Sequence, residues 1–217
     1  MGIIESGPLG PFRNKVGPVV GRKHMGQDVI TSVYHKSNKK HTPAQFSEQT
    51  KFGLLNGFIA DIAPLIKLGF GKYARKKSAK NAAFSYNYGH AFIPEGETWG
   101  INYPAMVYSR GDIVAPSGLT LSLQDDVLSF HWSAQPQSLH CQYTDLASFL
   151  VYCPAKERGI IRVNVAERHL LGFDVQLADD YTCILHCYVN FSSADGKVSG
   201  DNKYAGGIVF DDLTKSV

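Results

Sequence analysis

From Leu119 onward, apolar and polar residues alternate with a period of two. Leu119, Leu121 and Leu123 alternate with polar residues, and a short acidic turn at 124–126 follows them. Successive side chains of a β-strand point to opposite faces, so this period is typical of strands with one buried face. Six further apolar segments follow, at 127–132, 149–153, 159–165, 172–177, 181–191 and 204–210. The pattern predicts seven short antiparallel strands.

Seven short strands with a turn about every ten residues are typical of a β-sandwich. Trp132 falls in the second predicted strand, and Tyr181 begins the longest one. These two residues resemble the core tryptophan and the corner tyrosine of fibronectin type III domains. We therefore predict an immunoglobulin or fibronectin type III-like antiparallel β-sandwich over residues 113–217.

The first 41 residues are rich in glycine, proline and β-forming residues. Two extended pieces are expected at 16–23 and 27–34, with 24–26 closing a hairpin between them. A two-stranded hairpin alone is marginally stable in water, so it must lie on the rest of the chain or on a neighbouring copy. We interpret residues 1–41 as a β arm or hairpin. The residues expected to form an assembly arm are Val16, Val19, Val20, Val29, Ile30, Val33 and Tyr34.

Residues 42–112 are predicted to form a small helical region with short strands. Thr42 can cap a helix, Pro43 suits its first position, and Gln45 completes a capping box. Pro64 is expected to break or kink this helix. Further elements are expected as helices at 65–73 and 81–91 and as short strands at 99–103 and 105–109. The whole chain is therefore predicted to be an α+β protein.

The first predicted helix has apolar residues at roughly helical spacing. These are Phe46, Phe52, Leu55, Ile59 and Ile62, and they are expected to form its buried face. Gly53 and Gly57 weaken a helix by about 1 kcal/mol each relative to alanine. Glycines four residues apart would also let another backbone approach closely.

Charge is divided unevenly along the chain. Residues 1–110 hold 15 Lys/Arg and 6 Asp/Glu, whereas residues 111–217 hold 7 and 13. Such a division suits head-to-tail self-association or an acidic partner, although it can also arise without any function. The candidate basic patch comprises Lys39, Lys40, Arg75, Lys76 and Lys77. With Phe84, Tyr86 and Tyr88 nearby, it would suit non-specific nucleic-acid binding, but a charge cluster beside a helix end is more often simply solvated.

The sequence contains none of the motifs that most directly indicate catalysis. It has no G-x-S-x-G elbow, no P-loop, no H-E-x-x-H and no dinucleotide-binding glycine pattern. The paired acids at 125–126, 179–180 and 211–212 fall at predicted turns, where aspartate bonds its own backbone. We therefore expect no enzymatic activity and no cofactor.

Four cysteines lie in the second half of the chain, at Cys141, Cys153, Cys183 and Cys187. The chain shows no recognisable secretory signal peptide, so these thiols are expected to be reduced and buried. On a strand, Cys183 and Cys187 share one face with Leu185, which indicates an apolar inward row. A zinc site is the weaker alternative, because the spacings match no standard ligand pattern.

The sequence also indicates where the protein is expected to occur. No run of about 18 apolar residues occurs, so no membrane-spanning helix is expected. The protein is expected to be made in the cytoplasm and to end in an assembled particle or filament.

Several short motifs stand out in the N-terminal half. They are 10–21 (G-x-F-x-x-K-V-G-x-V-V-G), the Thr-Pro-Ala-Gln box at 42–45, 49–52, Gly69-Phe70, Tyr73-Ala74, 81–87 and 108–112. Together these stretches resemble an uncharacterised group of Bacteroidota proteins of about this length. The likeness covers most of the chain and is most specific over residues 10–112. It implies no activity, because the group carries none that is agreed. The Thr-Pro-x-Gln box followed by a helix also resembles stretches of phage virion proteins.

These features favour a self-assembling structural protein, such as a subunit of a phage-like particle, tube or filament. Its expected partners are copies of itself, with other virion or filament proteins as further candidates. One alternative is a glycan- or protein-binding module that uses the sandwich loops, with Trp99, Tyr103 and Tyr143 as an exposed aromatic platform. The second alternative is non-specific nucleic-acid binding by the basic N-terminal half.

Overall fold

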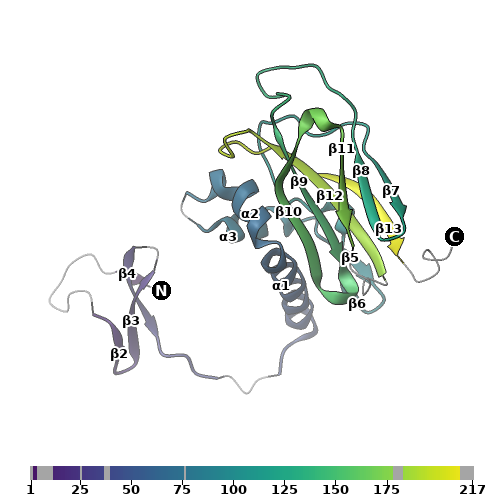
Figure 1. The fold of residues 1–217 in the computed structure, drawn as a ribbon. Helices are drawn as coiled ribbons and strands as arrows, with labels where there is room; N and C mark the ends of the chain where they lie inside the picture. Colours follow the sequence, from purple (N-terminus) through teal and green to yellow (C-terminus); the bar gives the residue numbers. More distant parts are fainter. Residues whose placement is uncertain are drawn as a thin grey trace. The chain divides into compact units, whose positions relative to one another are not determined.

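The structure is a computed structural model of the chain. It describes residues 2–3, 12–24, 26–36, 40–75, 77–177 and 183–210. Contacts between residues divide the chain into two compact units, Met1–Thr42 and Pro43–Val217. Figure 1 shows the elements of both units along the chain. Each unit is described below by itself.

The first unit contains one antiparallel sheet. Its strands are β1 (Gly2–Ile3), β2 (Asn14–Val16), β3 (Val19–His24) and β4 (Gln27–Ser32), in the order β1-β4-β3-β2. β3 and β4 form the predicted hairpin, in which His24 pairs with Gln27 and Gly26 has a positive φ of 84°. The single extended piece expected at 16–23 is wrong. Gly17, with a φ of 59°, and Pro18 turn the chain between β2 and β3.

This sheet has little core of its own. Val29, which is 2% exposed, is the one buried apolar side chain among the described residues of the first unit. The described residues of the first unit form no helix and no second sheet. Phe12 crosses close to Gly21, where an added Cβ would lie 2.1 Å from the Phe12 carbonyl oxygen. The unit is therefore essentially a single layer.

The second unit begins with three helices. These are α1 (Pro43–Asp61), α2 (Ala63–Phe70), which continues into the 3₁₀ turn η1 (Gly71–Tyr73), and α3 (Ala79–Asn87). The predicted start at Pro43 and the break beside Pro64 are confirmed. Across the described residues, no individual helix is long and apolar enough to cross a membrane. Taken together, α1 and the helical segment Ala63–Tyr73 reach that length and apolarity, but they are bent by 87° relative to each other.

Nine strands follow the helices in the described part of the second unit. A small hairpin consists of β5 (Phe92–Glu95) and β6 (Thr98–Ile101). The strand expected at 105–109 is wrong, since the short 3₁₀ turn η2 (Tyr103–Ala105) and irregular chain occupy that stretch. The seven predicted later strands are confirmed as β7 (Thr120–Gln124), β8 (Val127–His131), β9 (Leu146–Cys153), β10 (Arg158–Glu167), β11 (Gly172–Gln176), β12 (Cys183–Ser192) and β13 (Lys203–Phe210).

These seven strands form two antiparallel sheets. One sheet has the order β10-β9-β12-β13, and the other has the order β11-β8-β7. The two share a hydrophobic core in which Phe149 of β9 lies 4.9 Å from both Phe130 of β8 and Phe173 of β11, measured between ring centroids. The fold thus combines helices with mostly antiparallel sheets.

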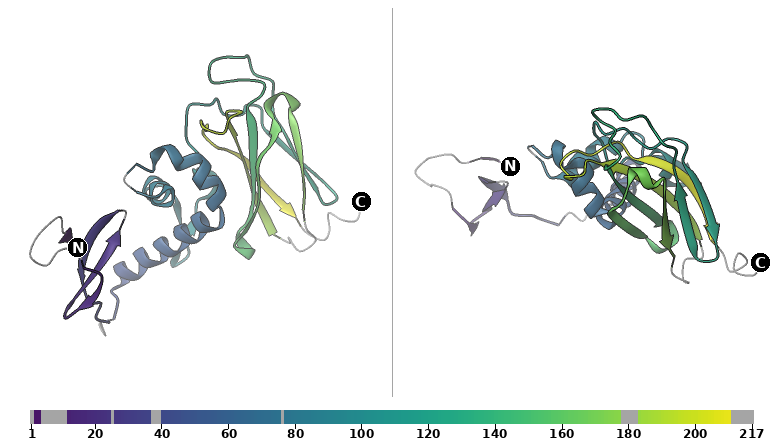
Figure 2. Two further views of the ribbon diagram at one scale, coloured as in Figure 1. Left: turned by 60° about the vertical axis from the view of Figure 1, so that its left-hand side comes forward. Right: turned by 45° about the horizontal axis from the view of Figure 1, so that its top comes forward.

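The four-stranded sheet is covered on both faces. Phe149 and Val151 of β9 point into the core shared with the three-stranded sheet, whereas Leu150 and Tyr152 point into a second core formed with the helices. Alternation therefore places apolar residues on both sides, which explains the continuous apolar run of β9. Both views of Figure 2 show the helices on the opposite side of this sheet from β7, β8 and β11. Helices and strands form one unit because they share this central sheet.

The cysteine prediction is partly wrong. Cys153 and Cys183 form a disulfide between neighbouring ends of β9 and β12, with their Cα atoms 6.4 Å apart. Cys141 and Cys187 are free and buried, as expected. The inward row of Cys183, Leu185 and Cys187 is confirmed, since all three pack in the core between the sheets. Within the described ranges, no three His, Cys, Asp or Glu residues are grouped so that they could hold a metal ion.

Candidate functional site

The residues predicted to form the assembly arm lie in the first unit's sheet or directly after it. Val16 is in β2, Val19 and Val20 are in β3, Val29 and Ile30 are in β4, and Val33 and Tyr34 follow it. Val33 is held by a hydrogen bond of 2.9 Å from its backbone N–H to the Pro18 carbonyl. Val16 is 57% exposed and Tyr34 is 84% exposed. The structure therefore gathers five of these residues in one small sheet and places Val33 and Tyr34 directly after its strand β4.

The pairing of the strands assigns these residues to two faces. Val20 and Val29 lie on one face, because the register pairs Val20 with Thr31 and Arg22 with Val29. Val16, Val19 and Ile30 lie on the other, since Val16 pairs with Val19 and Gly21 pairs with Ile30. Apart from Val29, each of these side chains remains at least partly exposed. Apolar side chains are thus available on both faces.

The basic patch is divided between the units. Lys40 is an exposed residue of the first unit, whereas Arg75 and Lys77 are exposed residues of the second. Lys39 and Lys76 lie outside the described residues. Lys77 lines a cavity that also contains Arg110, whose guanidinium carbon lies 4.1 Å from the centroid of the Tyr86 ring. Tyr86 also lines this cavity, whereas Phe84 and Tyr88 line a different one, so the structure places one of the three predicted aromatic residues beside a described lysine of the patch.

The predicted aromatic platform does not form. The Trp99 indole is half-buried, and its Nε1–H donates to Ser47 Oγ at 2.7 Å. Tyr103 is half-buried and stacks on His186 with a centroid distance of 4.1 Å. Tyr143 lines a separate cavity that Tyr103 does not reach. The prediction that Trp99, Tyr103 and Tyr143 form one exposed aromatic platform is therefore wrong.

Helix α1 presents part of its apolar pattern to solvent. Phe46 and Phe52 are exposed, whereas Leu55 and Ile59 are buried, so the predicted buried face is wrong for its first two members. Phe52 lies 5.1 Å from Phe84, and Phe84 lies 5.4 Å from Tyr88, measured between ring centroids. These rings line a cavity of about 580 Å³. Its wide aromatic surface carries few polar groups to define a ligand.

A second cavity lies on another side of α1 and combines aromatic and acidic groups. It has a volume of about 300 Å³. Gly53, Gly57 and Asp61 line it from α1 at successive steps of four residues, which places them on one helix face. The lining also includes three aromatic residues and a second acid, which are Phe58, Tyr103, Tyr152 and Glu157. We call this the tyrosine cavity.

The glycines of the tyrosine cavity face open space. A Cβ atom added at Gly53 or Gly57 would meet nothing within 4 Å. The expected close approach of a second backbone at these glycines is therefore wrong. That approach occurs at Gly69 instead, where an added Cβ would lie 2.3 Å from the Ser109 Cα. Gly53 and Gly57 keep one stripe of α1 free of side chains beside the cavity.

The tyrosines of this cavity remain protonated donors. The Tyr152 hydroxyl donates to Asp61 Oδ2 at 3.1 Å. Burial, reinforced by the charge of Asp61, raises the pKa of Tyr152 far above its usual value. Burial also raises the pKa of Tyr103 to about 12, with the charges of Glu95 and Glu157 adding to the effect. Negative charge in the cavity therefore comes from carboxylates.

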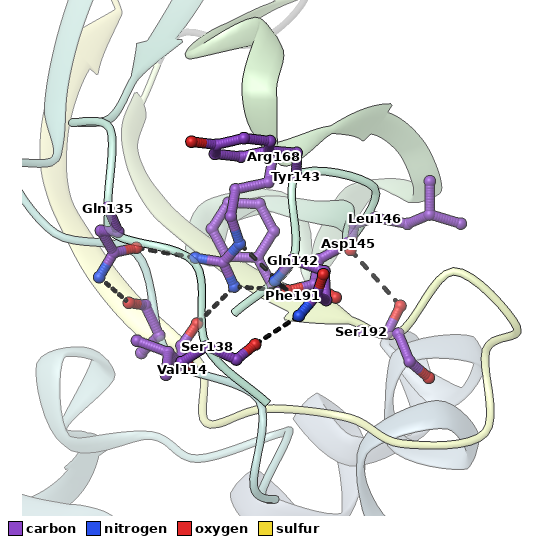
Figure 3. A network of polar contacts seen from close by, with 12 residues as sticks. Val114, Gln135, Ser138, Gln142, Tyr143, Asp145, Leu146, Arg168, Phe191 and Ser192 are labelled. Carbon is purple, nitrogen blue, oxygen red and sulfur yellow. Dashed lines mark hydrogen bonds and ion pairs between the residues drawn. The ribbon is translucent and has the colours of Figure 1, made fainter. Parts of the chain in front are cut away.

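A third arrangement, around Arg168, is a buried polar network (Figure 3). The side chains of Arg168 and Asp145 are 3% and 2% exposed, and Arg168 Nη2 lies 3.1 Å from Asp145 Oδ2. Arg168 also donates to Gln135 Oε1 and to the Val114 carbonyl, both at 2.7 Å. Its guanidinium carbon lies 3.8 Å from the centroid of the Phe191 ring.

The network ties together segments that are far apart in the sequence. Asp145 Oδ2 accepts the backbone N–H of Gln142 at 2.8 Å, and the Trp132 indole donates to the Arg168 carbonyl at 2.8 Å. Trp132, directly after β8, is buried as predicted, whereas Tyr181 lies outside the described residues. Because the guanidinium is bonded on several sides, this network holds the loops in place and offers little to a ligand.

The fold defines the chain first as a mixed helical and antiparallel β protein. A model of a family of unknown function, DUF6266, matches residues 10–206, so the chain belongs to that family. The match agrees with the resemblance to an uncharacterised family over most of the chain. No curated protein matches the sequence.

One solved structure with partial similarity is the crystal structure of chicken CNTN1 FN1-FN3 domains. The sequences are 11% identical, the TM-score is 0.34, and the similarity covers 46% of this chain. The chain spans about a third of the length of that structure, with 33% covered.

The tyrosine cavity was not predicted from the sequence. Its only sequence signal is the spacing of Gly53, Gly57 and Asp61, which marks a helix stripe without bulky side chains that ends in an acid. Tyr152 and Glu157 come from β9 and the chain after it, and no local pattern links them to α1. Their approach depends on how the helices pack on the central sheet.

Proposed function

We propose that this protein is a non-enzymatic structural subunit that associates with copies of itself through its N-terminal sheet. The assembly would be a particle, tube or filament of the kind that phage virion proteins build. Such a subunit would be made in the cytoplasm and would reach its final place by assembly.

The observation that carries this proposal is the single-layer sheet of the first unit. A β-sheet becomes stable when its apolar face is buried against another layer. Within the described residues of this unit, no helix or second sheet supplies that layer, and the partly exposed residues Val16, Val19 and Ile30 share one face. A second copy can provide the missing surface, and contacts between unlike surfaces generate rings or filaments.

We further propose that the two later sheets form a fibronectin type III-like sandwich. Seven antiparallel strands in sheets of four and three, with a shared core that includes Phe130 and Phe149, support this finer assignment. In an assembled particle, such a unit would serve as a compact building block while the N-terminal sheet makes the contacts.

The test compares the full chain with a variant whose sheet face is made charged. Val16→Asp together with Val19→Asp places two carboxylates on that apolar face, where burying them would be costly. We expect the wild type to sediment well above its 23.8 kDa monomer mass and to form particles or filaments under negative stain. The double variant should associate at least about tenfold more weakly, which corresponds to 1.4 kcal/mol.

A matched control carries the same added charge on the second unit. Thr120→Asp with Gln124→Asp changes two exposed residues of β7 and should associate as the wild type does. A wild type that stays a monodisperse monomer would overturn the proposal. Two alternatives would then remain, a glycan- or protein-binding module and a non-specific nucleic-acid binder. Binding on a glycan array would support the first, and nucleic-acid binding that weakens steeply with salt would support the second.

A further inference from the structure

We infer that the tyrosine cavity binds a guanidinium or ammonium group, and that this group is Arg22 from the N-terminal sheet of a second copy. This inference rests on the proposed function and adds a second contact on the opposite face of the N-terminal sheet, because Arg22 shares its face with Val20 and Val29 rather than with Val16 and Val19. It follows from the walls of the cavity, from its charge, and from the charge of the two units.

The walls of the cavity are aromatic. The Phe58 and Tyr152 rings lie edge to face, 4.8 Å apart between centroids, and Tyr103 lies 5.8 Å from Tyr152. Aromatic faces attract cations through the ring quadrupole, and the attraction grows when water is excluded. Arginine suits such walls because its planar guanidinium both stacks on rings and donates to carboxylates.

Two carboxylates give the cavity a negative charge. Asp61 and Glu157 line it, and neither forms an ion pair with Lys or Arg among the described residues. Asp61 is also the last residue of α1, and the final turn of that helix holds no basic residue. A helix C-terminus carries a partial negative charge, so an acid there is electrostatically unfavourable until a cation approaches. A bound guanidinium would offset both the charge of the two carboxylates and the partial negative charge of the helix C-terminus.

The cavity is open on the side formed by Gly53 and Gly57. Because these residues present no side chains and face open space, an incoming side chain can pass along α1 to reach Asp61. A volume of about 300 Å³ is ample for the planar end of an arginine. The exposed backbone also allows the strand that carries the arginine to come close.

The charge of the two units identifies the N-terminal sheet as the source. Residues 1–42 hold 7 Lys/Arg and 2 Asp/Glu, whereas residues 43–217 hold 15 and 17. Arg22 is exposed on β3 and pairs across the sheet with Val29, while the next residue, Lys23, pairs with Asp28. Of these two basic residues, Arg22 is therefore the one with no acid directly opposite it, and its guanidinium suits aromatic walls better than the ammonium of a lysine such as Lys15.

The first experiment is a double-mutant cycle on association of the full chain. Arg22→Gln and the pair Asp61→Asn/Glu157→Gln should each weaken association by about tenfold or more. Because both changes remove the same contact, combining them should weaken association no further. Glu97→Gln with Asp174→Asn removes two exposed carboxylates elsewhere and should leave association unchanged. Additive losses, or unchanged association in the cavity variant, would overturn the inference.

A second experiment tests the cavity without relying on assembly. The full-length Arg22→Gln variant is titrated with N-acetyl-arginine amide while the backbone amide signals of Gly53 and Gly57 are followed by NMR. These signals should shift with saturation, and the shifts should vanish when Asp61→Asn/Glu157→Gln is added. Absence of any shift in the Arg22→Gln variant would show that the cavity does not bind the cation.

The two experiments separate the inference from the proposed function. If the wild type associates but the cavity variant associates equally well, the cavity inference fails and the structural proposal stands. If the wild type is monomeric at all concentrations, the structural proposal and the assignment to a second copy both fail. The NMR titration then still decides whether the cavity is a cation site.

Discussion

The two units of this chain use similar strand-forming sequences but differ in what covers their sheets. In the second unit, β9 and β12 are buried from both sides by helices and by a second sheet. In the first unit, Val29 is the one buried apolar side chain among the described residues. Sheets need a covering layer to be stable. The comparison therefore suggests that stability is intrinsic to the second unit and depends on a partner surface in the first.

The largest contrast is expected from truncating one buried side chain in each unit. Phe149 is completely buried against Phe130 and Phe173, so Phe149→Ala should lower the free energy of unfolding by about 3–5 kcal/mol. Val29→Ala should have a much smaller effect on the main urea transition, because that transition reports the second unit. Chemical denaturation followed by tryptophan fluorescence measures both, since Trp99 and Trp132 lie in the second unit. Equal losses for the two variants would contradict a difference in intrinsic stability between the two units.

The strand pattern of the second unit was predictable because its side chains alternate or run continuously apolar. Segments from Leu119 to Phe210 each contain enough β-branched or aromatic residues to define a strand without tertiary information. The helix start at Pro43 was equally local. What the sequence could not show was that helices pack on one face of the central sheet, because a buried apolar run looks the same whatever covers it.

A second contrast concerns buried charge, which the structure places in the second unit. Arg168→Met leaves Asp145 buried without its partner, and removing one member of a buried pair costs about 3–5 kcal/mol. Thermal and urea unfolding should show this loss. The double variant Arg168→Met/Asp145→Leu should recover part of it, because no charge remains stranded. A loss no larger for Arg168→Met than for the exposed Lys197→Ala would contradict this account.

This network also marks the limit of prediction for the candidate site. Asp145 and Arg168 are separated by 23 residues, and nothing in the local sequence of either indicates a buried pair. Cys153 and Cys183 were expected to be reduced because no secretory signal peptide is recognisable, and their spacing does not reveal that strands β9 and β12 are neighbours. For the same reason, the approach of Tyr152 and Glu157 to the Gly53–Asp61 stripe could not be foreseen. Each case depends on contacts between distant segments.

The disulfide is a third source of stability that belongs to the second unit. It closes a loop between residues 30 positions apart, and in the chain-entropy model a loop of this size contributes about 3–4 kcal/mol. Cys153→Ala/Cys183→Ala should therefore lower the unfolding free energy of the second unit, and dithiothreitol should destabilise the wild type but not this variant. Thiol alkylation under denaturing conditions should modify two cysteines before reduction and four afterwards. Four reactive thiols without a reductant would contradict the disulfide.

The smallest expected effect is a dependence of stability on pH that originates in the second unit. His186 is half-buried, stacks on Tyr103, and has its Nδ1 2.9 Å from the Tyr204 hydroxyl. Burial lowers the pKa of His186 below 6.5. At a pH between the lowered pKa of the folded state and 6.5, His186 is protonated in the unfolded chain but not in the folded chain. The free energy of unfolding therefore rises with pH in that range. The contribution should be complete above pH 6.5 and should fall as the pH is lowered toward the folded pKa.

Urea unfolding between pH 5 and 8 (the range in which histidine titrates) should show a free energy of unfolding that rises with pH. The slope of this rise should be smaller in His186→Gln and unchanged in the exposed control His131→Gln. An unchanged slope in His186→Gln would show that this ring does not set the pH dependence.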